Sequence, residues 1–114
     1  MKNMLRVYYD LSSKCLEEYL PCIPRLKYSN AQSYLGKISR LREGIYKTIT
    51  LSEFNLITDE RLMDEEDTQE ILDTIAHEFA HMTYWKHGEE HTALTQSYLN
   101  IINESLKQNN KLAS

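Results

Sequence analysis

Apolar residues in the first part of the chain, residues 4–20, recur at spacings of three and four. This spacing places them on one face of a helix, and the residues are Leu5, Tyr8, Tyr9, Leu11, Cys15, Leu16 and Tyr19. Pro21 and Pro24 follow, and proline ends a helix and favours an extended path. The sequence therefore predicts an N-terminal helix with one buried face.

Partial alternation of apolar and polar residues marks the next part of the chain, in residues 25–28, 33–41 and 45–51. Such alternation is typical of strands. In the last run two of the residues on one face, Thr48 and Thr50, are threonines, which predicts one wetter face. Gly44 is expected in a turn between the second and third runs. These runs predict a small, mainly antiparallel sheet.

The helical spacing returns from Asp67, with apolar residues at Ile71, Ile75, Phe79 and Met82. Asp64 or Asp67 is a candidate cap for this helix. Gly88 interrupts the pattern, and a second helical run follows with Ala93, Leu94, Tyr98, Leu99, Ile101, Ile102 and Leu106. The polar tail, residues 107–114, is expected to fray or dock elsewhere. The whole chain, 1–114, is predicted to be one α+β domain.

Composition narrows the function classes. The chain has 114 residues and a net charge of −4, with no basic arm, which disfavours nucleic-acid binding. It has no apolar stretch long enough for a membrane span and no recognisable secretory signal. Cys15 and Cys22 are expected to be free thiols in a reducing compartment, and their spacing makes a metal pair a weak alternative. These features predict a cytoplasmic protein.

The segment most informative about chemistry is H-E-x-x-H, formed by His77, Glu78 and His81. Two histidines four residues apart on a helix lie on the same face, where neutral imidazoles can bind one zinc ion. The Glu78 carboxylate can reach a metal-bound water without binding the metal, and can act as general base. The alternative interpretation is two partly buried histidines near a helix end, because short motifs recur by chance.

A catalytic zinc site needs a third protein ligand, usually from another element. His87, just before Gly88, is favoured for this role, and His91 is the alternative. If His91 does not bind the metal, it either supports a metal ligand, donates a hydrogen bond in the transition state, or is an exposed residue without a role. Glu89 and Glu90 are possible ligands, but are more typical of a helix N-terminus. All four histidines fall between positions 77 and 91, which packing alone explains poorly.

Other side chains near the motif have two interpretations each. Asp73 lies four residues before His77 and either orients its imidazole or is a plain surface acid. Tyr84 and Trp85 follow the motif and are expected to be packing residues rather than catalytic ones. Iron or cobalt could replace zinc, since imidazoles bind several divalent ions.

His77-Glu78-x-x-His81 with a downstream His87-Gly88 pair resembles the minigluzincins, which are small zinc metallopeptidases, and is similar to the SprT-like peptidases. The resemblance covers roughly residues 25–106. It implies a minimal zincin-like domain and a zinc-dependent endopeptidase. SprT-like proteins usually have an aromatic residue where this chain has His91, and often a DNA-binding tail that is not found here.

The same resemblance extends upstream to the segment that contains Asn30, Ala31 and Gln32, which is similar to a strand lining the cleft in related families. It implies that residues 30–34 form the edge that binds an extended peptide substrate, by strand addition. The alternative is an ordinary edge strand without that role.

The minigluzincin resemblance also implies a latent form, in which the C-terminal segment blocks the cleft. We expect residues 100–114 to be that segment, acting within one chain or through a homodimer formed by the C-terminal helix. Two other functions remain open: a non-catalytic, metal-stabilised peptide-binding or regulatory module, and a metal-free helical interaction protein in which the motif is accidental.

Overall fold

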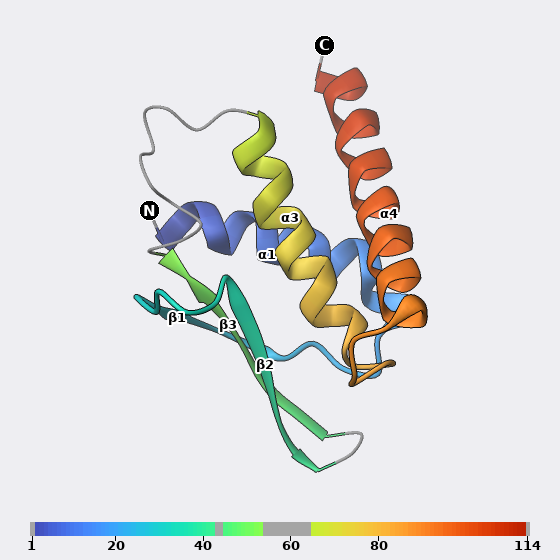
Figure 1. The fold of residues 1–114 in the computed structure, drawn as a ribbon. Helices are drawn as coiled ribbons and strands as arrows, with labels where there is room; N and C mark the ends of the chain where they lie inside the picture. The colour runs from blue at the N-terminus through green and yellow to red at the C-terminus, as the bar shows by residue number, and fades with distance from the viewer. Residues whose placement is uncertain (1, 43–44, 54–64, 114) are drawn as a thin grey trace.

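The chain forms a small α+β domain, as predicted. The structure, a computed structural model, describes residues 2–42, 45–53 and 65–113. Figure 1 shows the order of the elements along the chain. They are the helices α1 (Lys2–Leu16), α3 (Glu65–Ala80) and α4 (Glu89–Ala113), a 3₁₀ turn η1 (Glu17–Tyr19), and the strands β1 (Arg25–Ser29), β2 (Gly36–Arg42) and β3 (Ile45–Ser52).

Helix α1 packs with the face that its sequence predicts. Leu5, Tyr9 and Leu16 are buried in the core, at the expected spacing of three to four residues and its multiples. The α-helix ends at Leu16, four residues earlier than predicted, and continues as the 3₁₀ turn η1. Beyond this turn the chain is extended as the prolines require, and the Tyr9 hydroxyl donates a hydrogen bond to the Pro24 carbonyl.

The sheet has the strand order β1-β3-β2. β2 pairs with β3 in the antiparallel sense, but β1 pairs with β3 in the parallel sense. The expectation of a mainly antiparallel sheet is therefore wrong for one of the two pairings. The hairpin of β2 and β3 places β3 in the centre, beside β1. The turn expected at Gly44 lies outside the described residues.

The expectation of a wetter face on β3 is also wrong. Thr48, Thr50 and Ser52 are buried, as are the apolar residues that alternate with them. β3 is flanked by a strand on each side, so its neighbours cover residues that would be half exposed on an edge strand. The hydroxyls of Thr48 and Ser39 lie 2.6 Å apart and form a hydrogen bond across the β2–β3 pair.

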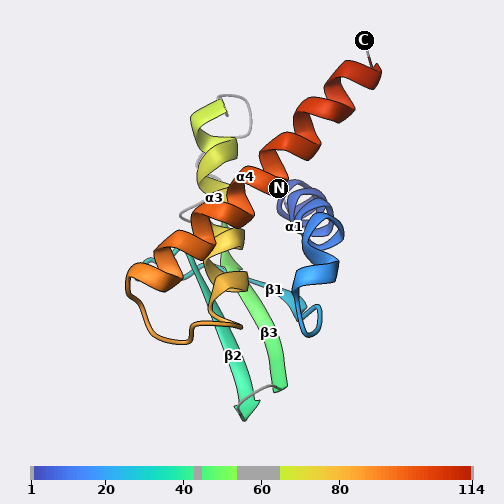
Figure 2. The ribbon, with the colours of Figure 1, turned by 90° about the vertical axis from the view of Figure 1, so that its right-hand side faces the viewer.

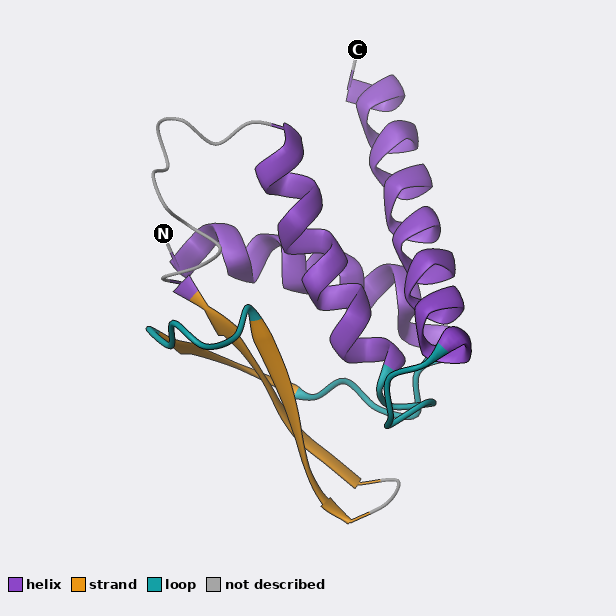
Figure 3. Ribbon diagram, viewed as in Figure 1, coloured by secondary structure: helices purple, strands orange, loops and turns teal. Residues whose placement is uncertain are grey.

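Helices α3 and α4 pack side by side, and all three helices of the described residues lie on one side of the sheet (Figures 2 and 3). The core face of α3 is fully buried at Ile71, Ile75 and Phe79. The amides of Gln69 and Asn103 join the two helices through reciprocal hydrogen bonds of 2.8 and 3.1 Å.

Both ends of this helical pair differ from the sequence-based prediction. α3 begins at Glu65, before Asp67, so Asp67 is not its cap, and Asp64 lies outside the described residues. α4 continues to Ala113, so the polar tail is helical rather than frayed. Ile102 is fully buried, which fixes the middle of α4 against the core.

Two further expectations concern the whole chain. Cys15 and Cys22 are free thiols, as predicted, but they are half-buried rather than buried. Neither belongs to the group of possible metal ligands found among the described residues, which consists of histidines. None of the described helices combines the length and apolar character needed to cross a membrane.

Candidate metal centre

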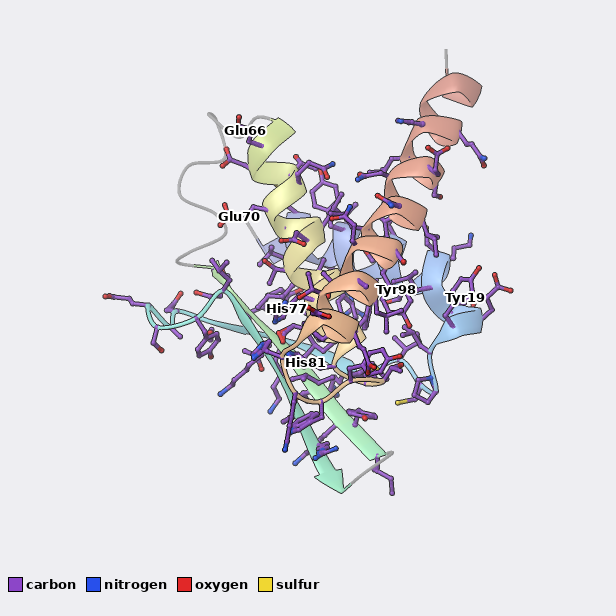
Figure 4. All side chains as sticks on the ribbon, turned by 45° about the vertical axis from the view of Figure 1, so that its right-hand side comes forward. Tyr19, Glu66, Glu70, His77, His81 and Tyr98 are labelled. Carbon is purple, nitrogen blue, oxygen red and sulfur yellow. The ribbon has the colours of Figure 1, made fainter. Side chains whose placement is uncertain are left out.

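His77 and His81 project from the C-terminal end of α3, as H-E-x-x-H on a helix requires. His77 lies in the last turn, and His81 follows Ala80 directly, with its backbone N–H still 3.3 Å from the His77 carbonyl oxygen. Figure 4 shows both side chains at this end of α3, beside the start of α4. The helical spacing therefore places both imidazoles on the same side of the chain, with ring centroids 4.8 Å apart.

The His87 imidazole reaches the same point from the loop between α3 and α4. Its Nε2 lies 3.1 Å from Nε2 of His77 and 3.2 Å from Nε2 of His81. Zinc–nitrogen bonds of 2.0–2.1 Å in a tetrahedron separate two ligand nitrogens by about 3.3–3.4 Å. The two observed separations are close to this value, so Nε2 of His87 lies from each of the other two nitrogens at a distance that suits two ligands of one small divalent ion.

Backbone contacts orient the His81 ring. Nδ1 of His81 lies 3.1 Å from the Tyr84 carbonyl oxygen. A carbonyl only accepts hydrogen bonds, so Nδ1 is assigned the proton and, in the neutral ring, Nε2 keeps its lone pair. Metal-binding histidines commonly use their other nitrogen in this way, which fixes the tautomer and the ring orientation.

His91, in the first turn of α4, lies next to the same rings but points elsewhere. Its Nε2–H donates to the His77 carbonyl oxygen at 3.0 Å, and its ring stacks on His81 with centroids 4.0 Å apart. The side chain is only 2% exposed. Ligand atoms of His77, His81 and His91 also lie within 4.8 Å of one another. His77, His81 and His91 thus form a group that could hold a metal ion, and His87 approaches His77 and His81 from the loop.

The electrostatics of this cluster favour neutral rings. Burial, followed by the nearby His91, His81 and His87, lowers the pKa of His77 from 6.5 to about 4. Burial also lowers the pKa of His81, although its hydrogen bond to the Tyr84 carbonyl opposes that shift. Only a neutral imidazole can bind a metal, so both rings are in the binding-competent state at neutral pH.

Glu78 lies beside the histidines and is 4% exposed. Burial raises the pKa of its carboxyl from 4.5 to about 7, because a charged carboxylate loses hydration inside the protein. A carboxyl that titrates near neutral pH can both accept and release a proton there. The arrangement can therefore combine a bound cation with an adjacent proton acceptor.

A cavity of about 300 Å³ opens onto these side chains. One wall comes from the edge strand β2, through Gly36, Lys37 and Ile38, and the other from His77, Glu78, His81, Trp85 and His87. The three β2 residues were not predicted to line a functional site, and Trp85 was expected to be a packing residue. A signal was present for the strand, since Gly36 is the glycine that precedes an alternating run.

Gly36 is required where β2 passes α3. A Cβ added there would lie 2.9 Å from Cγ2 of Thr74 and 3.2 Å from Cδ2 of Leu51. Glycine thus lets the strand approach the helix that carries H-E-x-x-H. Gly88 differs, because a Cβ there would meet nothing within 4 Å.

The residues expected to bind substrate lie elsewhere. Asn30, Ala31 and Gln32 belong to the loop between β1 and β2, not to a strand, and they do not line the cavity. The Ser52 hydroxyl donates to the Ala31 carbonyl at 2.6 Å, which holds this loop on the central strand. The cavity is lined instead by the strand that follows them. Whether these three residues contact a substrate stays a prediction.

Asp73 lines a smaller pocket that shares Gly36, His77 and Glu78 with the cavity. Its side chain is exposed, and no described contact joins it to the His77 ring. The structure therefore supports the interpretation of Asp73 as a surface acid rather than as the group that orients His77.

The described part of the C-terminal segment does not line the cavity. Residues 100–113 continue α4, and no described side chain beyond His87 lines the cavity. Blockage by a second copy of the chain stays a prediction.

Comparisons with protein-family models, with curated proteins and with solved structures found no match for this chain.

Proposed function

We propose that this chain is a zinc-dependent endopeptidase, with His77, His81 and His87 as metal ligands and Glu78 as general base. The observation that carries the proposal is the meeting of three Nε2 atoms beside a buried carboxyl in an open cavity. The resemblance to minigluzincins and SprT-like peptidases belongs to the same proposal, as does a zincin-like arrangement of the fold.

The donor set supports zinc as the metal. Three imidazoles with a fourth position left for water are typical of catalytic zinc sites. His87 is favoured over His91 as third ligand because its Nε2 points to the other two, whereas Nε2–H of His91 donates to the His77 carbonyl. A zinc ion held by these residues would supply a water molecule with a pKa near 7 and a Lewis acid for the scissile carbonyl.

Glu78 moves the proton in this proposal. Its carboxylate accepts a proton from the attacking water and then donates it to the nitrogen of the leaving amine. A pKa of about 7 suits both steps, because the group is neither fully ionised nor fully protonated at neutral pH. The cavity wall formed by Gly36, Lys37 and Ile38 is an edge strand, where backbone groups are available for an extended peptide.

The test pairs metal analysis with a substitution that removes only the base. Glu78→Gln should retain one zinc per chain and lose cleavage of an unfolded protein substrate. Glu70→Gln is the matched control, because Glu70 is an exposed carboxylate two turns earlier on α3, and it should retain both. Cleavage that survives in Glu78→Gln would exclude this mechanism.

Two other results would point to the alternative functions. Purified protein that contains zinc but cleaves nothing, even after removal of residues 107–114, would be a metal-stabilised binding module. This truncation leaves the buried Ile102 in place, so the helix keeps its anchor in the core. Protein that binds no divalent metal at all would be a helical interaction protein with an accidental motif.

A further inference from the structure

The charge of this protein is unevenly distributed. The chain has 13 basic and 17 acidic residues, but its three strands contain six Lys and Arg residues and no Asp or Glu. The remaining residues therefore carry seven basic and 17 acidic side chains. A positive sheet in an acidic protein creates a local field that attracts anionic groups, although the net charge would repel them.

The cavity at the histidines follows this pattern. Its wall on β2 contributes the cation of Lys37, and among the described residues Glu78 is the one acidic residue that lines it. Glu78 is buried, whereas Lys37 is exposed. Among the residues that line the cavity the exposed charge is thus positive, whereas the exposed carboxylate of Asp73 lines the adjoining pocket.

Arg40 is the best-placed of these cations. Its guanidinium carbon lies 3.8 Å from the centroid of the Trp85 ring. A guanidinium stacked on an aromatic ring is held in orientation and keeps the N–H groups at its edge for other partners. None of the ion pairs described in this structure involves Arg40, so these donors have no carboxylate from the described residues.

Trp85 connects Arg40 to the metal centre. The indole lines the cavity, lies 6.2 Å from the His81 ring and 6.3 Å from the Tyr46 ring, and is 39% exposed. The Tyr46 hydroxyl donates to the Met82 carbonyl at 2.8 Å, which ties β3 to the turn that carries Trp85. Trp85 thus lines the cavity, and Arg40 is joined to the cavity through its stacking on Trp85 rather than as a lining residue.

We propose that Arg40, stacked on Trp85 at one end of the histidine-lined cavity, binds a carboxylate of a peptide ligand. The carboxylate comes from an Asp or Glu side chain or from the C-terminus of the peptide, since both present the same two oxygens to a guanidinium. That this peptide is a substrate rests on the proposed peptidase function, but the binding itself does not.

The single Trp of the chain makes the test direct, because intrinsic fluorescence reports on Trp85 alone. Three ten-residue peptides are titrated: one with glutamates and both ends blocked, one with glutamines instead and both ends blocked, and the glutamine peptide with a free C-terminus. Each titration uses the full chain twice, once metal-free in a chelator and once as zinc-loaded Glu78→Gln, which does not consume the peptide.

We expect at least one carboxylate-bearing peptide to bind about tenfold more tightly than the blocked glutamine peptide, in both forms of the protein. Preference for the glutamate peptide identifies a side-chain carboxylate, and preference for the free end identifies a C-terminal one. Equal affinity for all three peptides would overturn the proposal. So would a preference that requires zinc, because the carboxylate would then be bound by the metal.

Substitutions locate the effect. Arg40→Gln should remove the preference without changing affinity for the blocked glutamine peptide, and Arg40→Lys should restore only part of it. Lys14→Gln, an exposed cation on α1, is the matched control and should change nothing. A preference that survives in Arg40→Gln would also refute the assignment. If Arg40→Gln fails to fold, the wild-type comparison of peptides still decides.

The outcome also separates this inference from the proposed function. A carboxylate preference in a zinc-loaded protein that cleaves neither these peptides nor an unfolded protein, even after removal of residues 107–114, refutes the peptidase and leaves the Arg40–Trp85 site standing. Cleavage that is equally fast and equally saturable for acidic and amide peptides supports the peptidase and refutes the site.

Discussion

Glu78 should cost the metal-free protein stability at alkaline pH. Its carboxyl titrates near 4.5 in the unfolded chain, but burial raises the pKa to about 7 in the folded one. Between these values the unfolded state has lost its proton while the folded state retains it. Stability therefore falls as pH rises through this window, and the full cost is present above pH 7.

The magnitude follows from the size of the pKa shift. One pKa unit corresponds to about 1.4 kcal/mol, so the shift of Glu78 corresponds to about 3 kcal/mol at pH 8. At pH 5, only about half a pH unit above the pKa of the unfolded state, the cost is under about 1 kcal/mol. Glu78→Gln keeps the shape of the neutral side chain and removes the charge, so it should escape this cost.

The assay is urea unfolding of the wild type and Glu78→Gln in a chelator, at pH 5 and pH 8. We expect Glu78→Gln to be more stable by about 3 kcal/mol at pH 8 and nearly equal to the wild type at pH 5. Histidine protonation is common to both proteins and cancels in the difference. Glu70→Gln, at an exposed site on the same helix, should show no such pH dependence.

A Glu78→Gln protein that is equally or less stable than the wild type at pH 8 would refute this reasoning. So would a stabilisation of the same size at both pH values, because a constant difference reflects packing rather than ionisation. Either result would mean that the Glu78 carboxyl is not held in a poorly hydrated environment.

Other predictions concern the histidines and the glycines. His87→Ala should weaken zinc binding more than 100-fold, because it removes a ligand, and His91→Ala only about 10- to 100-fold, because it removes a group that supports the ligands. Competition with a chromophoric chelator measures both affinities. A larger loss in His91→Ala than in His87→Ala would exchange their roles. Zinc affinity should fall as pH drops below about 6, since protons compete for the ligand nitrogens, but the low pKa of His77 should keep that ring available longer than a free histidine; isothermal titration at pH 5 and 7 tests this. Removal of zinc should lower the Tm, and an unchanged Tm would mean that no metal stabilises the fold. Gly36→Ala should destabilise the protein by about 1–3 kcal/mol because its Cβ would clash with α3, whereas Gly88→Ala should have little effect in the same denaturation assay.

Local patterns made much of this fold and site predictable. The spacing of apolar residues is sufficient to place α1 and α3, because helix hydrogen bonds and helix faces involve neighbours in sequence. The same spacing brings His77 and His81 together, since residues four apart share a face. His87 was identified by counting ligands rather than by geometry, and its convergence with the other two rings comes from the structure.

Non-local pairing made the rest unpredictable. The alternation in residues 25–52 does not indicate that β1 pairs with β3 rather than with β2. It therefore could not predict the parallel pair or the burial of Thr48 and Thr50. The prediction of which residues form the cavity wall was wrong for the same reason. Asn30, Ala31 and Gln32 precede the edge strand, and the strand reaches α3 only where Gly36 removes the side chain that would keep them apart.

The turn between α3 and α4 positions the histidine cluster. Its backbone is anchored at two points, by the Tyr46 hydroxyl on the Met82 carbonyl and by His81 Nδ1–H on the Tyr84 carbonyl. The second anchor is itself one of the candidate ligands, so the turn that delivers His87 also orients His81. The Tyr46 hydroxyl on β3 holds this turn through Met82. A carboxylate bound at the Arg40–Trp85 pair and a metal bound at the histidines would therefore act on the same backbone segment. Occupancy of either position should therefore restrict the turn and favour binding at the other.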